Sequence, residues 1–177
     1  MENTKKKTNI KKTIMIFVIM TCLMLAGTFL CLVVHEGSHY ITSIACNGTV
    51  TEFSLGSESH VGAYIQPQYI SIIALSSVLI PLVLSLIFVW FKNFYSSAIV
   101  LGFSFANLFN AFFGFAAIFL VDDMATRETF DMAMAFNHSQ NQTGMLFLIA
   151  GLVIVCTFCV AYGGHNFMQA LEKKVEI

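Results

Sequence analysis

The sequence predicts an all-α membrane protein with four transmembrane helices and a short β-hairpin or re-entrant segment after the first helix. Of its 177 residues, 57% are hydrophobic and only 11% are charged. A soluble domain of this size cannot bury so much apolar surface. A membrane-spanning helix needs about 20 mostly apolar residues, and the chain has four such runs. We therefore expect one membrane domain over residues 1–177, with the lipid bilayer as its surroundings.

The four predicted spans cover about residues 14–46, 69–91, 94–121 and 144–166. The first apolar run is too long for the core of a cleaved signal peptide, so we expect it to be retained. This helix should end at Asn47-Gly48, a pair typical of helix C-termini.

Two connections have patterns of their own. Alternating β-branched and aromatic residues predict a hairpin at about 49–66. The polar segment 122–143 predicts an outer loop with a short amphipathic helix near 129–136. The third span carries Ser104, Asn107, Asn110 and Gly114 at helical spacing, and this polar stripe should face another helix.

The basic residues predict the orientation. Eight of the nine lie before the first span, between the second and third, or after the fourth. Four crossings put these three regions on one side of the membrane, so the positive-inside rule places both termini in the cytoplasm. The formal net charge is only -1, and we expect no nucleic-acid partner.

The sequence His35-Glu36-Gly37-Ser38-His39 lies at the end of the first apolar run. On a helix, side chains at i and i+4 share a face, so both imidazoles can bind one Zn²⁺ while Glu36 acts on water as a general base. This pattern is typical of a zinc metalloprotease.

A catalytic zinc site usually has a third protein ligand. The third span ends in Asp122-Asp123. If the chain crosses the membrane four times, this end lies on the same side as the end of the first helix. At about 100° per residue, Asp122 projects on the side of Asn107, so Asp122 is the preferred ligand and Asp123 the alternative. Asn107 or Asn110 is expected to hydrogen-bond the substrate backbone or the oxyanion.

With these residues the chain resembles the site-2 protease family of intramembrane zinc metalloproteases. The resemblance covers the first three spans: the HExxH motif, a Gly-bearing hairpin, and a later helix with Asn107, Asn110 and a terminal aspartate. It implies a membrane-anchored polypeptide substrate, Zn²⁺ as cofactor, and the plasma membrane of a prokaryote. In that family the third ligand comes from a motif that reads Asn, then Pro, then Leu-Asp-Gly. Here the Pro is absent and Asp123 replaces the Gly.

The family's metal site usually lies toward the cytoplasm, whereas the charges here place it outside. Either this chain is inverted or one span is not a full crossing. Two other functions stay open: a catalytically silent relative that binds a membrane partner, and a small transport or immunity-type membrane protein whose polar stripe lines a path.

Overall fold

The structure is a computed structural model that describes residues 2–55 and 60–176, with side chains over residues 10–55 and 62–174. Within these residues, four helices are long and apolar enough to cross a membrane: Ile10–Ala45, Pro67–Phe88, Phe94–Leu120 and Gln142–Lys174. The predicted all-α membrane fold with four spans is therefore confirmed.

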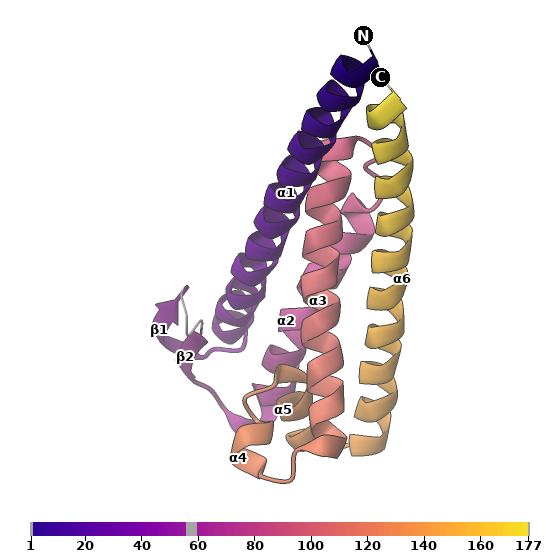
Figure 1. Cartoon of the computed structure of the whole chain (residues 1–177). Coiled ribbons are helices and arrows are strands. Elements are labelled where there is room, and N and C mark those ends of the chain that lie inside the picture. The colour runs from indigo at the N-terminus through magenta and orange to yellow at the C-terminus, as the bar shows by residue number, and fades with distance from the viewer. Residues whose placement is uncertain (1, 56–59, 177) are drawn as a thin grey trace.

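The elements in chain order are α1 (Glu2–Ala45), β1 (Thr49–Ser54), β2 (His60–Tyr64), the 3-10 turn η1 (Pro67–Tyr69), α2 (Ile70–Phe88), α3 (Phe94–Leu120), α4 (Met124–Arg127), α5 (Asp131–Asn137) and α6 (Gln142–Glu176). Helix α3 packs against both α1 and α6. Figure 1 shows both chain ends at one end of the bundle, and the hairpin, α4 and α5 at the other.

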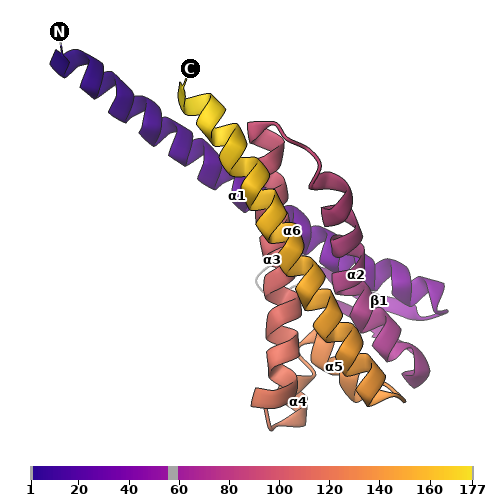
Figure 2. The same ribbon diagram turned by 90° about the vertical axis from the view of Figure 1, so that its right-hand side faces the viewer.

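Two glycines let α1 and α3 cross in close contact. Helix α1 passes α3 obliquely (Figure 2). A Cβ on Gly27 would collide with the carbonyl oxygen of Ile99, and one on Gly102 with that of Met24. Thr28 also donates from Oγ1 to the Gly102 carbonyl oxygen at 3.4 Å. Small residues permit such backbone contact in membranes, and the crossing sets the height at which the end of α1 meets α3.

Helix α1 ends where the sequence predicts. Asn47 has a φ of 58°, and the backbone N–H of Gly48 donates to the carbonyl oxygen of Ser43 at 2.8 Å. This is a Schellman-type stop. The chain then reverses into the predicted antiparallel hairpin of β1 and β2. The ring of Phe53 packs edge-on against Tyr40, with centroids 5.8 Å apart, which holds the hairpin beside the last turns of α1.

The connection between α3 and α6 folds back into the bundle and is not wholly an outer loop. Helix α5 lies close to the predicted amphipathic segment and buries Met132, Ala133 and Ala135 against α2, α3 and α6. A Cβ on Gly114 would lie 2.7 Å from Cβ of Met132. This small residue, about two turns before the end of α3, therefore lets α5 dock directly on the α3 backbone.

The polar stripe of α3 faces other helices, as predicted. Ser104, Asn107 and Gly114 are buried, and Asn110 is half-buried. Large apolar side chains point outward elsewhere on α3 and on α1, including Phe105, Phe109 and Phe29. An apolar outer surface is what a helix in contact with lipid requires.

Candidate metal centre

The two motif histidines form one face of α1, because residues four apart in a helix project in the same direction. The His35 and His39 rings stand edge to face, with centroids 5.0 Å apart. The motif lies within α1 and not at its frayed end, since the helix continues to Ala45. Local helix geometry alone thus brings the two imidazoles together.

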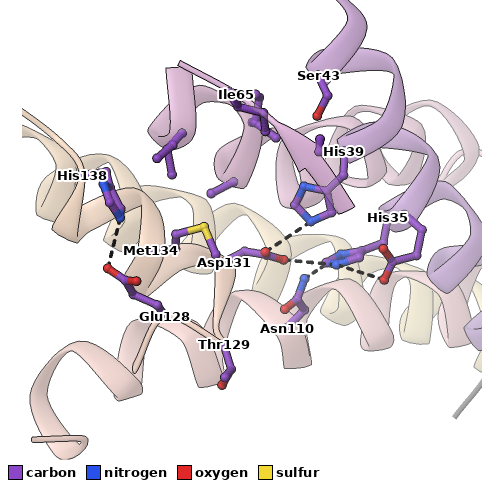
Figure 3. Close-up of a pocket in the computed structure, with 15 residues that line it drawn as sticks. His35, His39, Ser43, Ile65, Asn110, Glu128, Thr129, Asp131, Met134 and His138 are labelled. Atoms are coloured by element: carbon purple, nitrogen blue, oxygen red, sulfur yellow. Dashed lines mark hydrogen bonds and ion pairs between the residues drawn. The ribbon is translucent and has the colours of Figure 1, made fainter. Parts of the chain in front are cut away.

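Asp131, the first residue of α5, completes the group. Its Oδ2 lies 3.1 Å from Nε2 of His35, and its Oδ1 lies 3.2 Å from Nε2 of His39. Ligand atoms of the three residues all lie within 4.8 Å of one another. Figure 3 shows the carboxylate between the two rings. Among the described residues, this is the group of histidine, cysteine and acid side chains able to hold a metal ion.

This placement corrects the sequence prediction of Asp122 or Asp123 as the third ligand. Helix α3 ends at Leu120, and Val121 is extended, with φ −107° and ψ 112°. The angular projection that favoured Asp122 assumed a helix that has already ended. Both aspartates are exposed, and Asp123 instead caps α4 by accepting a hydrogen bond from the backbone N–H of Thr126 at 2.8 Å.

The sequence contains only an indirect signal for Asp131. It lies in the same connection as the two predicted acids and near the start of the predicted amphipathic segment. Nothing in the local pattern indicates that this segment returns into the bundle. That return depends on the contact of Met132 with Gly114, which is a tertiary interaction.

The carboxyl of Asp131 is adapted to remain ionised. Burial by itself raises the pKa of this carboxyl, but the side-chain hydrogen bonds with His35 and His39 outweigh that effect and hold the pKa well below its usual range. An ionised carboxylate is the form that binds a metal ion.

His35 also has a partner that orients its ring. Nδ2 of Asn110 lies 2.9 Å from Nδ1 of His35. A partner at the second ring nitrogen holds a metal-binding histidine in a fixed direction. Helix α3 therefore supports the histidine pair through His35.

The two predicted substrate-binding asparagines separate in the structure. Asn110 lies at the histidines, as described. Asn107 is buried, and its Nδ2 contacts the Val78 carbonyl oxygen at 3.3 Å and the Cys156 sulfur at 3.6 Å. Because Asn107 packs between α2 and α6, its expected contact with substrate or oxyanion does not fit its position. Its amide ties helices together.

Glu36 is buried beside the group formed by His35, His39 and Asp131. Its side chain is 5% exposed, and its Oε1 lies 3.8 Å from Nε2 of His35. The carboxylate therefore lies within one water molecule of the position that a metal would occupy. A buried carboxylate beside a water-binding position is suited to proton transfer.

The group opens into a cavity of about 730 Å³. Residues from α1, α2, α3, α5, the hairpin end and the turn after α4 line it, including Glu36, Ser43, Ala63, Ile65, Asn110, Glu128 and His138. Oγ of Ser43 is buried without a hydrogen-bond partner in the structure. The combination of polar groups with apolar walls makes a cavity that suits a peptide segment.

Comparison with known proteins adds no assignment, because no family model, curated protein or solved structure matches the chain. The function has to be inferred from the site itself.

Proposed function

We propose that this protein is an intramembrane zinc metalloendopeptidase that cleaves membrane-anchored polypeptides. The observation that carries this proposal is the convergence of His35, His39 and Asp131 from distant segments, with the Glu36 carboxylate beside them in a cavity. Two imidazoles, one carboxylate and a neighbouring glutamate constitute the donor and base set of many zinc hydrolases.

The donor set fits zinc. Two ligand atoms about 2.1 Å from one tetrahedral zinc ion stand about 3.4 Å apart. Asp131 Oδ2 lies 3.1 Å from the His35 nitrogen and Oδ1 lies 3.2 Å from the His39 nitrogen. With one ligand atom taken from each residue, the three atoms lie within 4.8 Å of one another, so a small closing movement would bring them to the tetrahedral spacing. Imidazole nitrogen with a single carboxylate also favours zinc over magnesium or calcium, which prefer oxygen ligands. Three protein ligands leave a fourth position for water or substrate.

A zinc ion held there would supply the Lewis-acid chemistry that activates water and polarises the scissile carbonyl. The residues of the chain do the rest. Glu36 accepts a proton from the attacking water and returns it to the leaving amine. Asn110 orients His35 through Nδ1, and the buried hydroxyl of Ser43 is available to hydrogen-bond the substrate backbone.

The cavity favours a substrate bound in an extended form. Ala63 of β2 and Ile65, just after it, line the same cavity as the metal group. An extended polypeptide can pair with such a strand and present its amides to attack, whereas a helix keeps its amides internally bonded. We infer that substrate segments unwind at this end of the bundle.

The proposed orientation follows from charge. The site and the chain ends lie at opposite ends of the bundle (Figure 1), and the lysines cluster near the chain ends. By the positive-inside rule, the termini are cytoplasmic and the site faces the outer side of a prokaryotic plasma membrane.

The test combines metal content with cleavage. Purified protein in nanodiscs should bind one zinc per chain and cut membrane-anchored reporter polypeptides. Glu36→Gln should retain the metal and lose cleavage, because the amide cannot accept the proton. Asp131→Asn should weaken metal binding, whereas Asp122→Asn, an exposed acid of the same connection, serves as the matched control. Absence of both bound zinc and Glu36-dependent cleavage would refute the proposal.

The same variants distinguish the alternatives. A catalytically silent relative would bind zinc without Glu36-dependent cleavage. A transport protein would keep its function when His35 or His39 is replaced by alanine.

A further inference from the structure

The far end of the cavity carries a second polar pair that the proposed chemistry does not use. Nε2 of His138 lies 3.0 Å from Oε1 of Glu128, and the two side chains are 31% and 33% exposed. Figure 3 shows this pair separated from Asp131 along α5, with Met134 between them. Both residues line the same cavity as the metal group. The pair is thus accessible to whatever occupies the cavity.

The described lining of the cavity carries acids and histidines but no permanently charged cation. The described lining residues include the carboxylates of Glu36, Asp131 and Glu128, and none is a lysine or arginine. Two of these acids belong to the metal group. The neighbouring Arg127 directs its guanidinium away from the Glu128 carboxylate, to the carbonyl oxygen of Val121, with Nε at 2.8 Å. A cationic ligand group is the natural partner for Glu128.

We propose that Glu128 and His138 form a subsite for the lysine or arginine side chain of the polypeptide substrate. This inference rests on the proposed endopeptidase function. Asp131 and His138 are seven residues apart along α5 and its cap, which at 1.5 Å per residue is about 10 Å. An extended substrate advances about 3.3 Å per residue. The basic residue therefore lies about three residues from the scissile bond.

The first test is the cleavage preference. The zinc-loaded protein in nanodiscs is given a proteome-derived peptide library, and the cleaved sites are aligned. Lysine and arginine should be enriched roughly tenfold at one position two to four residues from the cut. Glu128→Gln removes the charge but keeps an acceptor for His138, so the enrichment should disappear. Asp122→Asn should leave it unchanged.

The second test does not depend on cleavage. The Glu36→Gln variant is titrated with a labelled 12-residue alanine-rich peptide, acetylated and amidated, that contains one lysine or one norleucine. The lysine peptide should bind roughly tenfold more tightly, and adding Glu128→Gln should abolish the difference. If wild-type protein cleaves nothing, the proposed function fails, while this binding difference still decides the subsite.

Three outcomes would overturn the subsite. The first is equal binding of the lysine and norleucine peptides. The second is a lysine preference that survives Glu128→Gln, which would place the recognition elsewhere. A norleucine peptide with a free N-terminal amine is the third probe. If it binds as tightly as the lysine peptide, the chain terminus and not a side chain is recognised, and the proposal is wrong.

Discussion

The candidate metal group has two parts, the His35–His39 pair and Asp131, and they are positioned in different ways. The histidines belong to α1, a helix of 44 residues, and their proximity is a property of any helix that contains them. Asp131 begins α5, a helix of seven residues. A helix that short is not stable by itself in water, so α5 exists because it buries Met132, Ala133 and Ala135.

The placement of the two histidines therefore depends on α1 alone, whereas the placement of Asp131 depends on how α5 packs against its neighbours. The histidine pair is changed only by replacing a histidine or breaking α1. The aspartate is displaced by any change that moves α5 against α3, even one far from the ligands in sequence. We therefore expect the largest effects from changes to the histidine pair, smaller effects from changes that move α5, and the smallest from residues that support or lie beside the group.

The largest effect is expected from His39→Ala. The change removes one of three ligands, so zinc affinity should fall by more than about a hundredfold, beyond the loss typical of supporting residues. Helix α1 should persist, because alanine is the best helix former. Zinc titration and circular dichroism measure the two properties. Unchanged zinc affinity would show that the ion, if bound, lies elsewhere.

Gly114→Ala tests the part that depends on packing. The new Cβ would lie 2.7 Å from Cβ of Met132, so α5 must shift and carry Asp131 with it. Overpacking of this kind costs about 1–3 kcal/mol. Because zinc binding must bring Asp131 back against this strain, zinc affinity should fall by roughly fivefold to 150-fold. The histidine pair itself should be unaffected.

A matched glycine controls for the intrinsic preference of alanine for helices. A Cβ on Gly151 in α6 meets nothing within 4 Å, so Gly151→Ala should leave zinc affinity unchanged. If both variants bind zinc as the wild type does, the close contact of α5 with α3 does not position Asp131.

The same division explains what the sequence could predict. Apolar runs identified the spans, and Asn47-Gly48 identified the end of α1. The spacing of His35 and His39 showed that their imidazoles share one face of the helix. Each of these is a local property of the sequence. The position of Asp131 beside the two histidines was not predictable in this way. Asp131 reaches the histidines through a chain reversal that depends on long-range packing, and no periodicity within segment 122–143 encodes that packing.

A smaller effect is expected from Asn110→Ala. In the structure the amide nitrogen approaches Nδ1 of His35, so Nε2 carries the proton that faces Asp131. When Nε2 binds a metal, Nδ1 is protonated and needs an acceptor, which the Asn110 oxygen supplies after the amide turns over. Alanine should therefore reduce zinc affinity about tenfold.

Asn110→Asp sharpens this interpretation, since a carboxylate is a permanent acceptor. Zinc titration should give this variant an affinity equal to or higher than that of the wild type. If aspartate weakens binding as much as alanine does, Asn110 does not act through the His35 ring.

The smallest effect is expected at the two acids that the sequence favoured. Asp122→Asn and Asp123→Asn should each change zinc affinity less than about twofold, since both side chains are exposed and lie outside the group that can hold the ion. Hydrogen bonds from the Thr126 side chain and backbone lower the pKa of the Asp123 carboxyl. The cap therefore stabilises α4 fully at a pH above the pKa that the Asp123 carboxyl has in the unfolded chain. This stabilisation is lost as the pH falls through the lower pKa of the same carboxyl in the folded protein. Zinc titration at neutral pH should show a loss for Asp131→Asn and none for these two variants. The opposite ranking would return the third ligand to the end of α3.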